Sequence, residues 1–467
     1  MTTKKNLLSN KLVLASTTLL VVSLACSSST SDELADALPS SESAADASDP
    51  AGEVIPADTS ADQEQTESAL PPPTPTPIPE PLLLSSYGFG QDGRDIGYAF
   101  LLDNPNSEVA FEGTSYQVVA FDESGAIAET DSGYVELVMP NQTLGIANNL
   151  FVDDGVSVSA LEIQINAGDP VASGPLKQFE IDSPLYRSSD FFSYVSGVVR
   201  NPYDQDISNL RVSAIAYDDA GAIIGSGFTY LNFLLANEVS GVEFSLTSAV
   251  EPSRFEIYAS VSGLSSLTES AALPDGVLPV ALANYGFGQS GRDVGFGFLV
   301  ENPNAGHAVE NTQYQVSAFS SDGAVIGTEE GYIEVILPDQ SLGVGGDIFV
   351  LSDDIVHSVD VKIKSGEYVV SEPVAPFGSE NVSYKVGSFS PEVTGFVLSP
   401  YSKDITYVRV SALAYNDSGE IVGGGFTYLD FAPANDRAAV VVSVAVSETP
   451  SNVELYAFLS GLSDIQE

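Results

Sequence analysis

Residues Leu210-Arg-Val-Ser-Ala-Ile-Ala-Tyr-Asp-Asp-Ala-Gly221 decide the fold class of this chain. Apolar side chains occupy every second position from Leu210 to Ala216, and this period of two indicates a β-strand. The run ends in a tight-turn signal at Gly221, because glycine adopts positive φ without strain. Three other stretches, 121–125, 319–323 and 415–419, carry the same turn signal. Since no long segment has an apolar period of 3.6, the sequence predicts an all-β chain of small immunoglobulin-like sandwiches.

The hairpin occurs four times because the chain is a tandem duplication. Residues Leu82 to Leu267 recur from Val280 to Ile465 at a constant offset of 198, and 14 of the 20 positions from Tyr87 to Asn106 are identical in both copies. Asn104-Pro-Asn106 also corresponds to Asn201-Pro-Tyr203, so each copy divides into two units of about 95 residues. We therefore predict four β-sandwiches, A, B, A′ and B′, at residues 82–176, 177–268, 280–374 and 375–467, with a linker at 269–279.

A signal and a tether precede these units. Three lysines lead into the apolar run Leu12 to Ala25, which is long enough for a signal-peptide core and short for a membrane-spanning helix. The run ends at Cys26, the only cysteine of the chain, and resembles a bacterial lipoprotein signal. The resemblance implies that residues 1–26 are a signal peptide, that Cys26 is lipidated, and that the protein is exported and anchored to the outer face of a bacterial membrane, at the cell surface or in the periplasm. The alternative is an ordinary secretory signal with an incidental cysteine.

Residues 27–81 have the composition of a disordered linker. They include 12 acidic residues and no basic ones, and they end in the proline-rich stretch Pro71 to Pro81. Such a stretch favours extended polyproline II, so we expect a stiff spacer between the anchor and the sandwiches.

Unit B carries a family resemblance. Val195-Ser-Gly-Val-Val-Arg-Asn-Pro202, Ile207-Ser-Asn-Leu-Arg-Val212 and Ala214-Ile-Ala-Tyr-Asp218 are similar to the bacterial FxLYD domain, and Val393 to Gly423 repeats the pattern. Units A and A′ are also similar in outline to the sandwich of late-embryogenesis-abundant type 2 proteins. The resemblance implies immunoglobulin-like sandwiches on exported bacterial proteins, and it brings no catalytic residues to carry over.

The charge of the folded part constrains its partners. From Leu82 onward there are 52 acidic and 13 basic residues, a net charge of −39. Such a surface repels phosphate backbones, so we expect no nucleic-acid partner. Adaptation to salt explains the charge without a specific site. Calcium bound in the acidic loops is the alternative, and its candidate ligands are Asp153, Asp154, Asp218, Asp219, Asp353 and Asp354. No other cofactor is predicted.

Catalytic residue patterns are sparse. His307 and His357 align with Val109 and Ser159, so a histidine-based centre could exist in one copy at most. No cysteine follows Cys26, which leaves neither a thiol nucleophile nor a thiolate zinc site in the folded units. Carboxylates do recur in both copies, as in Glu256 with Glu454, but they lie in strand-like runs. We predict a protein that is not an enzyme, and a carboxylate-based envelope glycan hydrolase is the alternative.

The repeated segment Tyr87-Gly-Phe-Gly-Gln-Asp-Gly-Arg-Asp95 is the best candidate for ligand recognition, because it combines aromatic faces, a guanidinium donor and a carboxylate on a backbone that permits close approach. The candidate residues are Tyr87, Phe89, Gln91, Arg94 and Asp95 with Tyr285, Phe287, Gln289, Arg292 and Asp293. The alternative is that the aromatic residues belong to the core and Arg94 pairs with a neighbouring carboxylate.

Two classes of function follow from these observations. The first is a non-enzymatic, membrane-anchored lipoprotein with a binding or structural role at the cell envelope, where its partner would be a cell-wall glycan or an envelope protein. A calcium-stiffened adhesin is a variant of this class. The second class is the envelope hydrolase.

Overall fold

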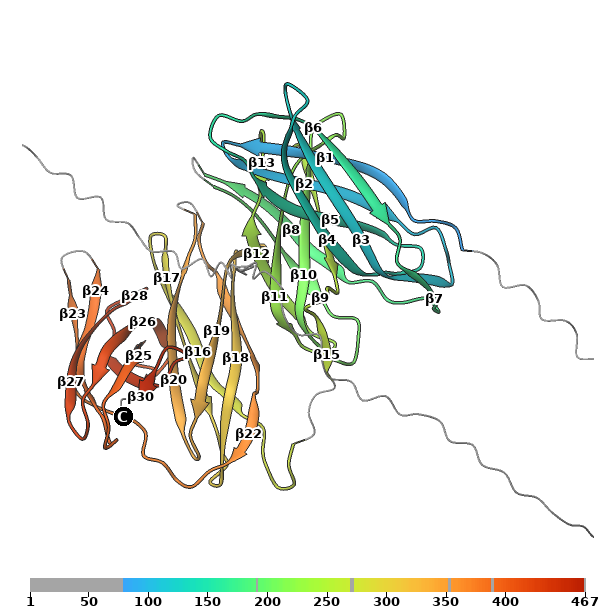
Figure 1. Ribbon diagram of the computed structural model, residues 1–467. Coiled ribbons are helices and arrows are strands. Elements are labelled where there is room, and N and C mark those ends of the chain that lie inside the picture. Colours follow the sequence, from blue (N-terminus) through green and yellow to red (C-terminus); the bar gives the residue numbers. More distant parts are fainter. Residues whose placement is uncertain (1–78, 190–191, 269–272, 352–353, 388–389, 466–467) are drawn as a thin grey trace, which may run out of the picture. The chain divides into compact units, whose positions relative to one another are not determined.

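The computed structural model describes residues 79–189, 192–268, 273–351, 354–387 and 390–465. Within these ranges the regular structure consists of strands in antiparallel sheets (Figure 1). No helix among the described residues is long and apolar enough to cross a membrane. The predicted all-β fold of tandem immunoglobulin-like sandwiches is confirmed.

Sandwich A consists of two sheets that enclose one core. The first sheet has the order β1-β2-β5, and the second has the order β4-β3-β6 with β7 paired to β3. These strands are β1 (Leu83–Asp92), β2 (Asp95–Asp103), β3 (Val109–Asp122), β4 (Ile127–Val138), β5 (Thr143–Phe151), β6 (Val158–Asn166) and β7 (Asp169–Ala172). Every second side chain points inward, and Phe100 and Tyr116 meet edge to face in the core, 5.0 Å apart.

Sandwich B has the same two-layer build. One sheet has the order β12-β9-β8, and the other has the order β13-β11-β10-β14 with β15 paired to β10. The strands are β8 (Glu180–Ser188), β9 (Ser193–Arg200), β10 (Asp206–Tyr217), β11 (Ile223–Leu234), β12 (Val239–Ser245), β13 (Thr247–Ser248), β14 (Arg254–Ser260) and β15 (Ser266–Thr268).

The second copy repeats both sandwiches strand by strand. Sandwich A′ has the sheets β16-β17-β20 and β19-β18-β21 with β22, and sandwich B′ has the sheets β23-β24-β27 and β28-β26-β25-β29 with β30. The strands of A′ are β16 (Ala281–Ser290), β17 (Asp293–Glu301), β18 (His307–Phe319), β19 (Val325–Ile336), β20 (Ser341–Phe349), β21 (Ser358–Lys364) and β22 (Glu367–Val370). Those of B′ are β23 (Gly378–Val386), β24 (Pro391–Leu398), β25 (Ile405–Tyr415), β26 (Ile421–Ala432), β27 (Arg437–Ser443), β28 (Ala445–Val446), β29 (Asn452–Phe458) and β30 (Asp464–Ile465).

The predicted tight turns close the hairpins β3–β4 and β10–β11 and their copies. In the β10–β11 turn, Asp218 Oδ1 accepts the backbone N–H groups of Ala220 (2.9 Å) and Ala222 (2.8 Å). Gly221 then takes a φ of 83°, which a residue with a side chain rarely adopts. An aspartate followed by glycine three residues later therefore fixes this hairpin register.

Strand β10 buries both of its faces. Val212 and Ala214 are fully buried in the core of sandwich B. Ile215, on the opposite face, is equally buried and packs with Ala99 and Ala147 of sandwich A. The sheet β1-β2-β5 of A thus packs on the β10–β11 face of B, and the corresponding strands of A′ and B′ meet in the same way.

Candidate functional site

The repeated segment Tyr87–Asp95 covers the end of strand β1, the turn after it and the first residue of β2. The two faces of β1 have different neighbours. Phe89 packs against the core of sandwich A, whereas Gly88 and Gly90 face sandwich B. A Cβ atom on Gly90 would lie 1.9 Å from the carbonyl oxygen of Ile224, and one on Gly88 would lie 2.5 Å from that of Ile223. Real Cβ atoms essentially never approach other atoms within 3.0 Å. Glycine is therefore required at both positions because two backbones touch there.

The second copy makes the same contact. A Cβ atom would lie 2.2 Å from the carbonyl oxygen of Ile421 at Gly286, and 2.0 Å from that of Val422 at Gly288. We call these two contacts the glycine seams: Gly88 and Gly90 against Ile223 and Ile224, and Gly286 and Gly288 against Ile421 and Val422. The most strongly repeated segment of the sequence thus joins each A-type sandwich to the B-type sandwich that follows it.

The two candidate glutamines hold loops of their own sandwich. Gln91 Nε2 donates to the carbonyl oxygens of Gly93 (2.9 Å) and Val156 (2.8 Å), and Gln91 Oε1 accepts the N–H of Val158 (2.9 Å). Gln289 makes the corresponding three bonds in the second copy. These amides fasten the end of β1 or β16 to the loop before β6 or β21, which is a structural role.

The two candidate arginines also bond to their own sandwich. Arg94 Nε donates to the carbonyl oxygen of Val152 (2.9 Å) and lies 3.9 Å from the carboxylate of Asp154. Arg292 Nε donates to Val350 (3.2 Å), and its guanidinium lies 4.2 Å from the ring centre of Phe349.

The remaining candidates divide between core and surface. Phe287, like Phe89, packs against a sandwich core. Tyr87 and Tyr285 are 50% and 45% exposed, and Asp95 and Asp293 are exposed at the start of β2 and β17. Ligand binding by the segment stays a prediction that concerns its exposed tyrosines, arginines and aspartates.

One arginine crosses each contact between an A-type sandwich and the B-type sandwich that follows it, and the sequence did not indicate these residues. Arg409 donates from one terminal nitrogen to the carbonyl oxygen of Gly345 (3.0 Å) and to the hydroxyl of Tyr314 (3.2 Å), and its guanidinium lies 4.1 Å from the ring centre of Phe426. Arg211 lies at the equivalent position in the first copy and donates to the carbonyl of Ala147. The available signal was an arginine at the same position of two otherwise apolar strands.

The acidic loops proposed for calcium have separate surroundings. The carboxylate of Asp218 caps its own turn, as described above, with Asp219 exposed beside it. Asp154, next to Asp153, is near Arg94, whereas Asp354 forms an ion pair with Arg187 of sandwich B. Asp353 lies outside the described residues. Among the described residues no group of three or more His, Cys, Asp or Glu side chains is placed to hold a metal ion. Calcium binding stays a prediction.

A partly buried carboxylate has different neighbours in the two copies. In sandwich A, Asp131 accepts hydrogen bonds from the hydroxyl of Tyr98 and from Asn148 Nδ2 (2.9 Å). In A′ the equivalent residue is Glu329, and the two donors are replaced by Phe296 and Gly346. Burial, followed by repulsion from the carboxylate of Asp347, raises the pKa of Glu329 to about 7.

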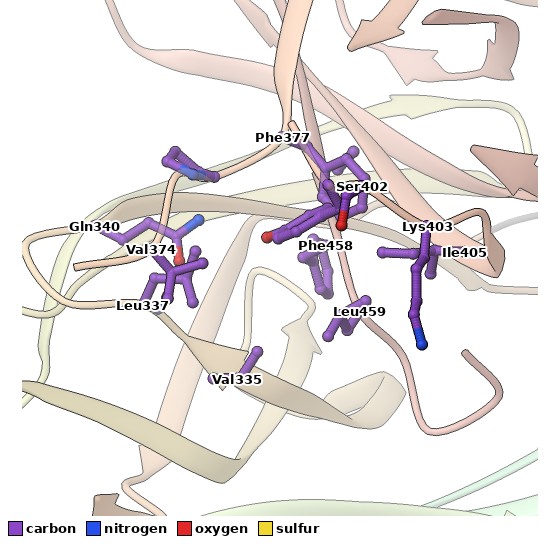
Figure 2. A pocket seen from close by; sticks show the side chains of 13 residues that line it. Val335, Leu337, Gln340, Val374, Phe377, Ser402, Lys403, Ile405, Phe458 and Leu459 are labelled. Atoms are coloured by element: carbon purple, nitrogen blue, oxygen red, sulfur yellow. Dashed lines mark hydrogen bonds between the residues drawn. The ribbon is translucent and has the colours of Figure 1, made fainter. Parts of the chain in front are cut away.

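An apolar cavity of about 270 Å³ lies where sandwich A′, its connector and sandwich B′ meet (Figure 2). Leu337 comes from A′, Phe377 from the start of B′, and Tyr401 and Phe458 from further along B′. The rings of Phe377 and Tyr401 meet edge to face, 5.0 Å apart. Lys403 provides the charged group of the lining. Apolar walls with one cationic side chain could hold a small apolar molecule that carries an acidic group.

Comparisons with known proteins add no family. No protein-family model matches the chain, and no curated protein matches it. Among solved structures it is similar to the native conformation of E. coli alpha-2-macroglobulin, at 10% identity and a TM-score of 0.13. The match covers 80% of this chain and 27% of that chain. A TM-score this low supports no argument, so the class of the protein rests on its own strands: an all-β chain of paired immunoglobulin-like sandwiches. The FxLYD resemblance stays a prediction.

Proposed function

We propose that this chain is an exported, non-enzymatic lipoprotein, anchored through Cys26 to the outer face of a bacterial membrane, with a binding or structural role at the cell envelope. The signal, Cys26 and the linker up to residue 78 lie outside the described residues, so the anchor rests on the sequence pattern. The sandwiches then serve as a tethered platform that presents its outer sheet faces and loops to the envelope.

The glycine seam is the observation that carries this proposal. The two copies share the residues that join sandwich to sandwich, including Gly90 and Gly288, whereas Tyr98 of the first copy corresponds to Phe296 in the second. A tethered protein that presents binding faces depends on fixed spacing between its domains, since neighbouring domains otherwise move independently. Backbone contact at each seam fixes that spacing within each pair of sandwiches.

The recurring carboxylates also support a non-enzymatic role. Glu256 accepts hydrogen bonds from the hydroxyls of Tyr217 and Tyr258, and Glu454 accepts one from Tyr456. Burial raises the pKa of Glu256, but the bonds from Tyr258 and Tyr217, together with the charge and hydrogen bond of Arg254, outweigh burial and leave this pKa below its usual value. A general acid for glycoside cleavage needs the opposite shift.

The anchor is tested by metabolic labelling of the full chain with an alkyne-tagged fatty acid, followed by separation of membrane and soluble fractions. We expect label and membrane location in the wild type, and loss of both in Cys26→Ser. Label that persists in Cys26→Ser, or a wild-type chain that is released without label, would overturn the proposal.

A further inference from the structure

Strands β4, β3 and β6 form one sheet of sandwich A (Figure 1). The outer face of this sheet is rich in uncharged hydrogen-bonding groups. Cross-strand pairing brings side chains of the three strands together, because residues opposite each other in a sheet point to the same side. We call six of these residues the amide face: Ser115, Gln117, Ser132, Tyr134, Gln164 and Asn166. They line a shallow hollow of about 370 Å³.

The equivalent face of sandwich A′ is covered by sandwich B. Gln315, which corresponds to Gln117, is 2% exposed, and its Nε2 donates to the carbonyl oxygen of Gly241 in B (3.1 Å). On the same face, Lys362 pairs with Glu238 of B (2.9 Å). A protein surface therefore covers part of this face in the second copy, although Gln315 Oε1 is buried there without a hydrogen-bond partner and Tyr332 stays 52% exposed.

Within the described residues of sandwich A no neighbouring sandwich covers the amide face, and its side chains differ from those of the equivalent face in A′. The charged residues Glu330, Lys362 and Lys364 of A′ correspond to Ser132, Gln164 and Asn166 in A. Gln117 is retained but exposed. In a folded part with a net charge of −39, six neighbouring positions without a charge are unusual. Carboxylates border them on two strands: Glu162 lies one same-face position further along β6 and accepts a bond from Gln164 (2.9 Å), and Glu136 lies one same-face position beyond Tyr134 on β4.

Hydrogen-bonding capacity remains free on this face. Among the described residues, the side chains of Gln117, Ser132 and Tyr134 have no hydrogen-bond partner. Amides and hydroxyls both donate and accept, so together they match the hydroxyl groups of a sugar chain. Tyr134 is 79% exposed beside them and offers an aromatic surface for the apolar side of a sugar ring.

We propose that the amide face is a binding site for a neutral oligosaccharide. This inference rests on the binding role proposed above and names the class of its ligand. The absence of charge decides for a neutral glycan, since an anionic one would be repelled by the surrounding field. Gln117 and Tyr134 are the residues on which affinity depends most.

A second copy of the chain fits the face less well. It would have to dock through the outer face of B′, as B docks on A′. In B, a Cβ atom on Gly241 would lie 2.5 Å from Ser317 Oγ, so this contact favours glycine. B′ has Ala439 at that position, and sandwich A has the larger Val119 in place of Ser317. The contact between B and A′ therefore cannot be repeated between molecules unless the atoms at this point move apart.

The test is binding of the full chain to an array of neutral glycans, followed by calorimetric titration with soluble neutral chains such as maltoheptaose, cellohexaose and chitohexaose. Polygalacturonate serves as the anionic comparison. The variants are Gln117→Ala and Tyr134→Ala, with Tyr332→Ala as the matched control because Tyr332 occupies the equivalent position in A′ and is 52% exposed. Unchanged melting temperatures establish that the variants fold.

We expect binding of at least one neutral glycan, weakened at least tenfold by Tyr134→Ala and by Gln117→Ala and unchanged by Tyr332→Ala. Binding that is indifferent to both variants, or no binding across the array, overturns the inference. Concentration-dependent self-association that both variants abolish also overturns it, in favour of a second copy. None of these outcomes affects fatty-acid labelling at Cys26, so failure here is separate from failure of the anchor.

Discussion

Alanine in place of Gly90 should push sandwich A away from sandwich B. The added Cβ would start 1.9 Å from the carbonyl oxygen of Ile224 and must reach about 3.0 Å, so the two backbones have to separate by roughly 1.1 Å. Overpacking of this kind costs about 1–3 kcal/mol, and the upper end applies because the opposing atoms belong to the backbone. At 2–4 °C per kcal/mol for a unit of this size, melting should fall by about 6–12 °C.

The assay is differential scanning calorimetry of the full chain with Gly90→Ala, and of Gly288→Ala in the second copy. Gly174→Ala is the matched control, since a Cβ there would meet no atom within 4 Å. The control should melt within about 2 °C of the wild type, because a surface change of this kind shifts stability by no more than about 0.5 kcal/mol. If Gly90→Ala melts with the control, the seam does not hold the two sandwiches together.

Three further predictions concern charge, hydrogen bonding and ions. The folded pKa of Glu329, about 7, exceeds its unfolded value, so the contribution of this carboxyl group to stability is greatest at low pH and is lost as pH rises through 7. Glu329→Gln should therefore raise the melting temperature at pH 8 and flatten its fall from pH 5 to pH 8, whereas Asp131→Asn, at a hydrogen-bonded carboxylate, should lower it. Asn302 is 1% exposed and donates to three carbonyl oxygens at 2.7–3.4 Å. Asn302→Ala should therefore lower the free energy of unfolding in urea by about 2–4 kcal/mol. A loss under about 1 kcal/mol would contradict this role. At fixed ionic strength, the melting temperature should be the same with calcium as with EDTA. In a separate sodium chloride series, the melting temperature should rise with salt. A rise specific to calcium would instead favour the stiffened adhesin.

Local rules account for the strands and turns. The alternation from Leu210 to Ala216 and the turn at Gly221 both depend on residues close in the chain, and the hairpin β10–β11 forms where they predict it. The duplication is likewise readable at once, since an offset of 198 requires no structural information.

The candidate site was less accessible to the sequence. The sequence indicates the segment from Tyr87 to Asp95 as a candidate for ligand recognition, and that role stays a prediction. Its glycines contact a neighbouring sandwich, a contact that composition does not reveal. The sequence did not indicate Arg211, because a lone arginine in a strand is ordinarily a solvated side chain. Its structural role depends on the hydrogen bond that it donates to a carbonyl oxygen in another domain.

The sequence by itself determined that this chain is a duplicated set of small β-sandwiches behind a predicted signal and tether, because strand period, turn chemistry and repetition are local properties. Tertiary structure alone decided what covers the second face of each strand. Gln315 and Gln117 are the same residue at equivalent positions, yet one is buried against sandwich B and the other is exposed. An alternating pattern of side chains predicts that a strand has two faces. Only the position of the neighbouring domains determines which face contacts protein and which contacts solvent.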